Sequence, residues 1–193
     1  MIKGFFCSSK PHLKKLNVLF LTCLLSVAGS DGFNALFYQV CWDIIEEDVV
    51  AAVRDFLSST SLPISVTATS IALIPKVKNP SKWSEYQSIS LCNTSNKILT
   101  KLLNDRLKLI LLSLIVPNQS SFVPQRQIGD NILLAQEIMQ SLSANKKEWN
   151  VALKLDMAKA YDLVDWTFLE VVLLNFGFPV HWVRLVQNCI QNY

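Results

Sequence analysis

The 193-residue sequence lacks the cysteine patterns of a zinc site and of a disulfide-bonded secreted domain. Its five cysteines form no C-x-x-C pair, have no histidine nearby at zinc-ligand spacing, and are odd in number. They are Cys7, Cys23, Cys41, Cys92 and Cys189. This wide spacing favours reduced thiols in an intracellular protein, nuclear or cytoplasmic.

An apolar run long enough to cross a bilayer is also missing. Leu16–Ala28 is interrupted by polar residues, whereas a spanning helix needs about 20 residues. Lys14 and Lys15 precede this run and small residues end it, which gives residues 1–28 the shape of a signal peptide. A secreted or membrane-associated product of this segment stays an alternative, which the cysteine pattern opposes. We expect no stable membrane span.

Internal repeats and low-complexity tracts are absent, and the net charge is only +3. Because 51% of the residues are hydrophobic, a core can be filled. Positive charge is concentrated between Ile71 and Lys108, a range that contains seven basic residues and two acidic ones, Glu85 and Asp105. The seven are Lys76, Lys78, Lys82, Lys97, Lys101, Arg106 and Lys108. Such a patch suits phosphate backbones, and a solvated helix face is the alternative for Lys97, Lys101 and Lys108.

Three- and four-residue apolar spacings predict most of the chain to be helical. The expected helices are Phe33–Ser59 with a break near Asp43, Ser95–Leu114, Asp130–Ala144, Trp166–Phe176, and a last helix opened by Pro179. Ser30 or Asp31 is expected to cap the first helix, Asp130 the third, and Gly177 to end the fourth.

Three segments are predicted to be extended. Thr67–Pro75 and Tyr86–Leu91 flank a turn at Lys78–Ser81, and Val151–Leu155 alternates apolar and polar residues before Asp156. The mixture predicts an α+β fold, helix-rich with a small antiparallel sheet. A carboxylate at a strand end is a good place to hold Mg²⁺, although an aspartate there is also an ordinary turn residue or helix cap.

Six short motifs follow one another along the chain. They are Ala72-Leu-Ile-Pro-Lys76, Ser88-Ile-Ser-Leu-Cys-Asn93, Asn118-Gln-Ser-Ser-Phe-Val-Pro124, Arg126, Asp130-Asn-Ile132 and Leu155-Asp-Met-Ala-Lys-Ala-Tyr161. From about Asp31 to Tyr193 the chain resembles LINE-type (non-LTR) retrotransposon reverse transcriptases, of the kind abundant in plant genomes. The resemblance implies the fingers and a partial palm of a right-hand polymerase fold with an incomplete sheet. It predicts residues 1–30 as a segment of uncertain origin, 31–145 as fingers and 146–193 as a truncated palm.

The resemblance also implies roles for individual residues. Asp156 and the backbone carbonyl of Met157 would hold Mg²⁺, and Tyr161 would lie under the sugar of the incoming deoxynucleotide. Arg126 and Lys76 would contact the nucleotide, while Lys78, Lys82, Lys97 and Lys101 would contact nucleic acid. The implied partners are an RNA template, a DNA primer and deoxynucleoside triphosphates. The sequence indicates no specific protein partner. Packing over the turn is the alternative for Tyr161, and simple exposure at a strand end is the alternative for Lys76.

Several positions depart from the family pattern. Gln87-Ser-Ile-Ser90 stands where the family has Arg-Pro-Ile-Ser, Ala28-Gly-Ser-Asp-Gly32 replaces Pro-Gly-Pro-Asp-Gly, and Gln125 replaces a glycine. The sequence contains no Asp-Asp pair, which supplies further metal ligands in the family. A single carboxylate cannot hold the two metal ions of nucleotidyl transfer. We therefore expect the 193-residue chain to be inactive as an enzyme, and a non-catalytic nucleic-acid-binding protein is the competing interpretation.

Overall fold

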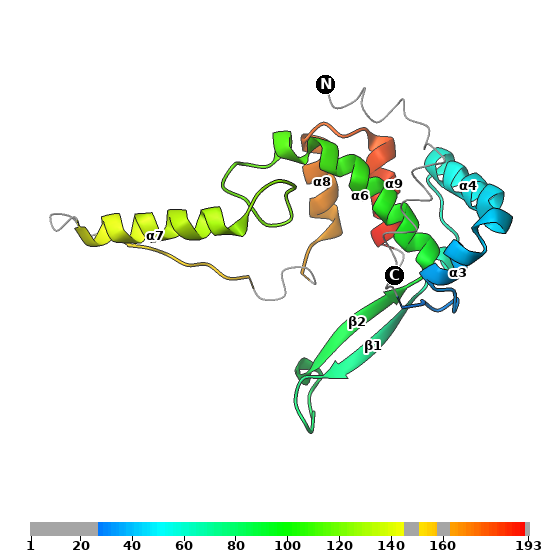
Figure 1. Ribbon diagram of the computed structural model, residues 1–193, viewed down its shortest axis with the longest axis horizontal. Helices are drawn as coiled ribbons and strands as arrows, with labels where there is room; N and C mark the ends of the chain where they lie inside the picture. The colour runs from blue at the N-terminus through cyan, green and yellow to red at the C-terminus, as the bar shows by residue number, and fades with distance from the viewer. Residues whose placement is uncertain (1–26, 145–150, 158–162, 192–193) are drawn as a thin grey trace. The chain divides into compact units, whose positions relative to one another are not determined.

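The structure is a computed structural model that describes residues 27–144, 151–157 and 163–191 (Figure 1). The predicted signal-like segment and Tyr161 lie outside these described residues. The chain divides into two compact units. The first comprises the described residues up to Asn104 together with those from Trp166 onward, and the second comprises Asp105–Asp165. The domain boundaries expected near residues 30 and 145 stay a prediction.

The first unit begins with two helices, α3 (Ala35–Val40) and α4 (Trp42–Ser59). They meet at Cys41, so the predicted break is confirmed close to its expected position. The predicted caps are wrong, because the side chain of Asn34 accepts the hydrogen bond from the Phe37 N–H at 3.0 Å. The Asp31 carboxylate instead accepts from the N–H of Phe33 at 3.0 Å.

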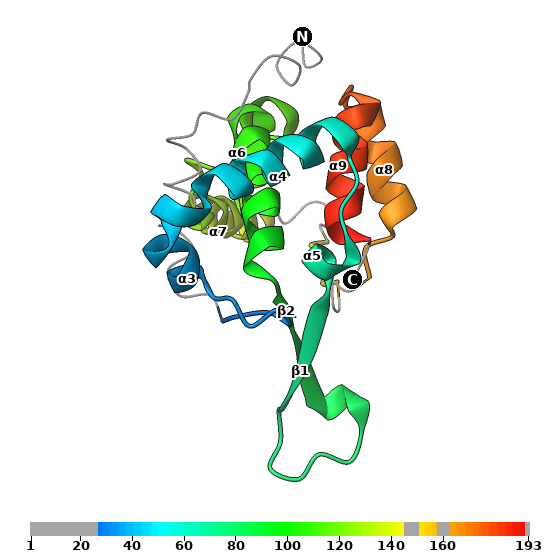
Figure 2. The same ribbon diagram turned by 90° about the vertical axis from the view of Figure 1, so that its right-hand side faces the viewer.

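A two-stranded antiparallel hairpin follows the short helix α5 (Ile64–Thr67). Strand β1 (Thr69–Pro75) pairs with β2 (Tyr86–Cys92), in a register that places Thr69 opposite Cys92 and Pro75 opposite Tyr86. The connection contains a single 3₁₀ turn, η1 (Trp83–Glu85). Both expected strands are therefore confirmed, as is a helix-rich fold with a small antiparallel sheet. The hairpin projects from the helices of its unit, with η1 at its far end (Figures 1 and 2).

Asn93 fixes the base of the hairpin, at the junction between β2 and the next helix. Its side chain is 1% exposed, accepts from the Ser30 hydroxyl and the Asp31 N–H, both at 3.2 Å, and donates to the Ser65 carbonyl at 2.7 Å. The Thr94 hydroxyl adds a bond to the Phe33 carbonyl at 2.8 Å. Three segments far apart in sequence are thus joined where the hairpin leaves the helices.

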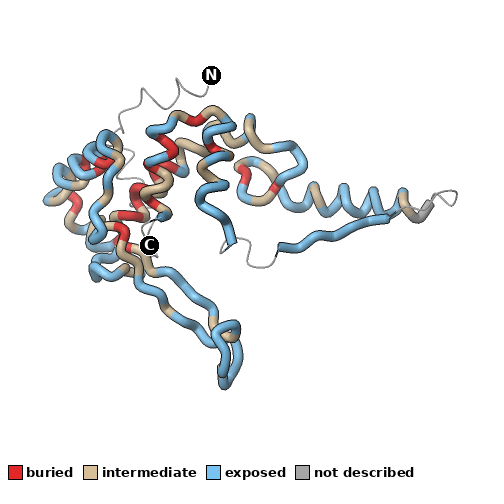
Figure 3. The backbone as a smooth tube through the Cα atoms, turned by 180° about the vertical axis from the view of Figure 1, so that it is seen from behind, coloured by how far each residue is buried: buried red, intermediate tan, exposed pale blue. Residues whose placement is uncertain are grey.

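The core of the first unit lies between α4, the first half of α6 (Thr94–Leu114) and α9 (Val180–Ile190). Its buried members are Trp42, Val50, Val53, Phe56, Ile98, Leu99, Leu102, Leu103, Leu185 and Cys189. Figure 3 shows these buried positions in red, while the hairpin is almost entirely exposed. Helix α6 matches the expected range Ser95–Leu114 to within one residue, and its inward face holds Leu99, Leu102 and Leu103.

The last two helices also match the sequence. Helix α8 (Trp166–Asn175) is followed by Gly177 at φ 86°, a conformation that suits glycine, and Pro179 precedes the first residue of α9. The ring of Phe178 stacks on that of Trp182 with centroids 4.6 Å apart. The Gln187 amide donates to the Glu170 carboxylate at 2.7 Å and so links α9 to α8.

The second unit contains helix α7 (Ile128–Ala144), which begins two residues before the expected cap. Asp130 therefore lies within its first turn, and the prediction that Asp130 caps this helix is wrong. The Asn131 amide holds the helix start to the preceding loop, donating to the Asn118 carbonyl at 2.8 Å and the Ser120 hydroxyl at 2.9 Å. In the parts of the chain that the structure covers, no helix is long and apolar enough to cross a membrane.

The strand expected over Val151–Leu155 is not formed. Residues 151–157 have no regular secondary structure, and Val151, Leu153 and Leu155 are 88%, 79% and 81% exposed. A strand needs a neighbour to pair its backbone N–H and C=O groups. Within the described ranges, β1 and β2 pair only with each other. Alternation along one segment therefore predicted its two faces but not the partner that would make it a strand.

Candidate functional site

The residues singled out from the sequence fall in both units. Lys76, Lys78, Lys82, Lys97 and Lys101 belong to the first unit, and Arg126, Asp156 and Met157 belong to the second. Tyr161 is outside the described residues.

Asp156 lies on the exposed, irregular segment at residues 151–157. Met157 beside it is 76% exposed. Among the described residues, no three His, Cys, Asp or Glu side chains gather as a metal site would require. Mg²⁺ demands near-octahedral oxygen ligands and gives up its water reluctantly. One carboxylate and one carbonyl could hold such an ion only weakly, and they do not fit a pair of ions.

Arg126 holds the loop that directly follows α6. Its guanidinium donates to the carbonyls of Gln119 at 2.6 Å and Ile115 at 2.9 Å, and also to that of Val116. Ile115 directly follows the last residue of α6, and because carbonyls at a helix C-terminus lack intrahelical donors and carry partial negative charge, a cation there is favourable. Its expected role in holding a triphosphate stays a prediction, and that role would require the guanidinium to exchange these carbonyls for phosphate oxygens.

Gln125 adopts a backbone conformation that favours glycine. Its φ is 66°, in the left-handed region, as is that of Phe122 at 62° in the same loop. A side chain with a Cβ costs about 1–2 kcal/mol in this region. The position where the resemblance expects glycine is therefore one where glycine is suited, and the strain lies directly before Arg126.

Gln125→Gly is expected to raise the free energy of unfolding of the second unit by about 0.5–1 kcal/mol, because strain relief exceeds the added entropy of the unfolded chain. Urea denaturation and hydrogen exchange at the Arg126 amide measure the change. The matched control is Gln127→Gly in the same loop, where φ is not positive and where we expect a loss. Equal losses in both variants would contradict the assignment of strain to Gln125.

Three lysines occupy the far end of the hairpin. Lys76 follows the last residue of β1, Lys78 lies in the connection, and Lys82 directly precedes η1. All three are exposed, and across the described residues none is within salt-bridge distance of a carboxylate. This end of the hairpin, residues 76–86, is the hairpin tip. Its cations are available to an anionic partner.

Lys97 and Lys101 lie on α6, at the opposite end of the hairpin. The Lys97 ammonium donates to the Val27 carbonyl at 2.8 Å, and both lysines are half-buried. A seven-residue strand separates the two ends by about 20 Å. The basic region read from the sequence is thus divided, and the hairpin tip holds the lysines that are free of such contacts.

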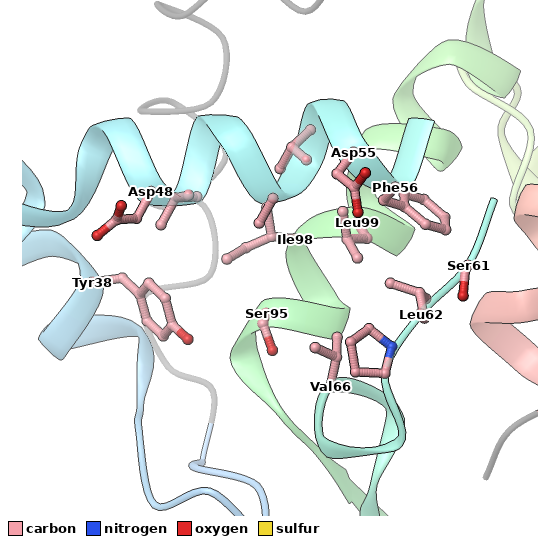
Figure 4. Close-up of a pocket in the computed structure, with 14 residues that line it drawn as sticks. Tyr38, Asp48, Asp55, Phe56, Ser61, Leu62, Val66, Ser95, Ile98 and Leu99 are labelled. Atoms are coloured by element: carbon pink, nitrogen blue, oxygen red, sulfur yellow. The ribbon is translucent and has the colours of Figure 1, made fainter. Parts of the chain in front are cut away.

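A pocket of about 330 Å³ lies between α3, α4, residues 61–66 and the start of α6 (Figure 4). Most of its lining is apolar, and its polar side chains are Tyr38, Asp48, Asp55, Ser61 and Ser95. The pKa of the Tyr38 hydroxyl is raised, mainly by burial and also by the negative charge of Asp31. A hydrogen bond with Ser95 acts in the opposite direction but is the smaller effect. Two carboxylates and no cation make this pocket unsuited to phosphate groups, whereas the hairpin tip carries three exposed cations.

Sequence reasoning missed two residues that matter here. Asn93 was noted only as part of a short motif, because its three partners are 28 to 63 residues away. Trp83 was not singled out, although it lies among the tip lysines. Its 81% exposure cannot be read from composition, since tryptophan is usually largely buried.

Comparison with known proteins identifies the class. Residues 74–192 match the family described as reverse transcriptase (RNA-dependent DNA polymerase). This match covers more than half of the chain and includes the hairpin tip, Arg126 and Asp156. The chain belongs to the reverse transcriptase family.

One relative indicates the type of reverse transcriptase. Over 161 residues the chain is 31% identical to "Transposon TX1 uncharacterized 149 kDa protein" of Xenopus laevis, and the alignment covers 83% of this chain. The chain spans only 12% of the length of that relative. The resemblance to LINE-type retrotransposon enzymes is confirmed, and the chain carries part of a reverse transcriptase domain. The family implies template and nucleotide partners and the use of Mg²⁺.

Proposed function

We propose that this chain forms the fingers and the first palm segment of an RNA-directed DNA polymerase, and that its hairpin tip binds the phosphates of a nucleic acid. The observation that carries the proposal is the group of exposed lysines Lys76, Lys78 and Lys82, within the part that matches the family. Lysine contacts to phosphate release counterions, so the binding is independent of sequence and weakens as salt rises.

Asp156 is proposed as the first metal-binding carboxylate of the polymerase, with the Met157 carbonyl beside it. Its position in the family motif and its exposure support this assignment. Bound Mg²⁺ would neutralise the triphosphate and align it with the primer end. The chain's own contributions would be the oxygen ligands of the Asp156 carboxylate and the Met157 carbonyl, and Tyr161 would select deoxynucleotides from beneath the sugar. The substrates proposed are an RNA template, a DNA primer and deoxynucleoside triphosphates.

Neutralising the hairpin tip tests the binding proposal. The triple variant Lys76→Gln, Lys78→Gln, Lys82→Gln is expected to weaken binding of a labelled single-stranded oligonucleotide and to reduce the slope of log K against log salt by about 2. The matched control removes three exposed cations elsewhere: Arg54→Gln, Lys154→Gln and Arg184→Gln. Fluorescence anisotropy at several salt concentrations measures both. Equal effects of the two triple variants would show that net charge, and not the hairpin tip, governs binding.

A further inference from the structure

Trp83 is a large aromatic side chain displayed at the hairpin tip. It is 81% exposed, and its ring lies 6.3 Å from that of Tyr86, at an interplanar angle of 48°. Tyr86 is half-buried and is the first residue of β2. The Tyr86 ring therefore lies beside the indole in a tilted arrangement, and most of the indole surface stays open to a partner. An exposed aromatic face suits stacking.

The turn that carries Trp83 is held rigidly by Glu85. The Glu85 carboxylate accepts from the N–H groups of Ser81 at 2.6 Å and Lys82 at 3.2 Å. These bonds lower the pKa of the Glu85 carboxyl, so it is charged and occupied by the backbone. The Glu85 carbonyl also accepts from the Lys76 N–H at 2.7 Å. These hydrogen bonds hold the backbone that carries Trp83, which reduces the ordering cost of binding.

Three lysines lie close to this aromatic pair in the sequence. Lys82 directly precedes Trp83, and Lys76 and Lys78 lie at the other side of the connection. The acidic residue of the tip is Glu85, whose carboxylate accepts hydrogen bonds from the backbone N–H groups of Ser81 and Lys82. An aromatic face with cations on either side is the combination that binds single-stranded nucleic acid, because bases stack on the ring while phosphates meet the cations.

We propose that Trp83, supported by Tyr86, stacks on an unpaired base of a single-stranded nucleic acid whose phosphates contact the tip lysines. This inference rests on the proposed nucleic-acid binding and adds to it a preference for unpaired bases. A base within a duplex has both faces covered by its neighbours, so the indole gains nothing from it. Stacking accepts any base, so the site distinguishes single strands from duplexes and not one sequence from another.

The test separates stacking from charge with two probes of equal length and charge, an oligothymidylate and an abasic oligonucleotide. Trp83→Leu is expected to weaken oligothymidylate binding by about 5- to 100-fold and to leave binding of the abasic probe unchanged. Trp83→Phe keeps a ring and is expected to retain most of the affinity. Trp166→Leu, at an exposed tryptophan of α8, is the matched control and is expected to change neither probe. Anisotropy titrations on the full chain measure all four proteins.

The outcomes distinguish this inference from the binding proposal beneath it. If Trp83→Leu binds both probes like the parent while the triple lysine variant weakens both, stacking is wrong and phosphate binding stands. If neither the triple lysine variant nor Trp83→Leu alters binding, both proposals fail. If Trp83→Leu lowers the affinity for both probes equally, stacking is also wrong, because the abasic probe has no base that could stack on Trp83.

Discussion

Leu185→Ala is expected to lower the free energy of unfolding of the first unit by about 2–5 kcal/mol. Leu185 is 2% exposed and lies in α9, within the core that α4 and α6 also build. Removing its buried methyl groups loses their transfer free energy and leaves a cavity among helices fixed by their neighbours. Since domains are stable by only about 5–15 kcal/mol, this single change removes a large share of the total.

Two further substitutions control this measurement. Leu36→Ala makes the same chemical change at a helical residue of the same unit that is 59% exposed, and it is expected to cost less than about 0.5 kcal/mol. Leu185→Met keeps the volume of the side chain and is expected to cost less than about 1.5 kcal/mol. Urea denaturation followed by helical ellipticity gives all three values.

The same variant tests how far the C-terminal helices are part of the fingers. In the structure α9 contacts the end of α4 directly: the His181 ring bonds to the Leu57 carbonyl at 2.8 Å, and the Asn188 amide bonds to the Thr60 carbonyl. We therefore expect Leu185→Ala to speed hydrogen exchange in α4 as well as in α9. Faster exchange confined to α9 would contradict a shared core and would favour a boundary near residue 145.

Helices were predictable because their signal is local. The spacing of apolar residues placed α6 to within one residue of its start and at its end, and Pro179 and Gly177 bounded the last two helices as expected. The cap of α3 was not predictable. Ser30 and Asp31 are good capping residues by type, but Asn93 binds both of them from more than 60 residues away. The helix instead begins at Ala35, which leaves Asn34 in the capping position.

The candidate site shows the same division. Exposure of Lys76, Lys78 and Lys82 followed from their place around a predicted turn. The separation of Lys97 and Lys101 from them did not, because it depends on the length and direction of the hairpin. Arg126 was assigned to a nucleotide by resemblance, whereas its carbonyl partners depend on the fold of residues 115–126. Residue types therefore predicted which side chains could bind phosphate, whereas the groups that these side chains contact in the protein depend on the fold.

A purified protein of residues 1–193 is expected to show no primer extension on an RNA template, with either Mg²⁺ or Mn²⁺. Nucleotidyl transfer needs two metal ions about 4 Å apart, held by carboxylates from more than one place in the chain. Asp156 is the one residue that the family motif assigns to this task, the sequence has no Asp-Asp pair, and the described residues gather no metal-binding cluster. Without a second carboxylate group, neither ion is held firmly enough to align the primer end with the triphosphate.

Inactivity has meaning only if the same protein is folded and binds its template. The preparation is therefore expected to bind single-stranded oligonucleotide with the salt dependence proposed for the hairpin tip while it incorporates no deoxynucleotide. Asp156→Asn should leave that binding unchanged, as should Asp55→Asn at an exposed carboxylate of α4. Template-dependent incorporation that Asp156→Asn abolishes and Asp55→Asn preserves would prove the prediction wrong, because a complete metal site would then exist within these residues.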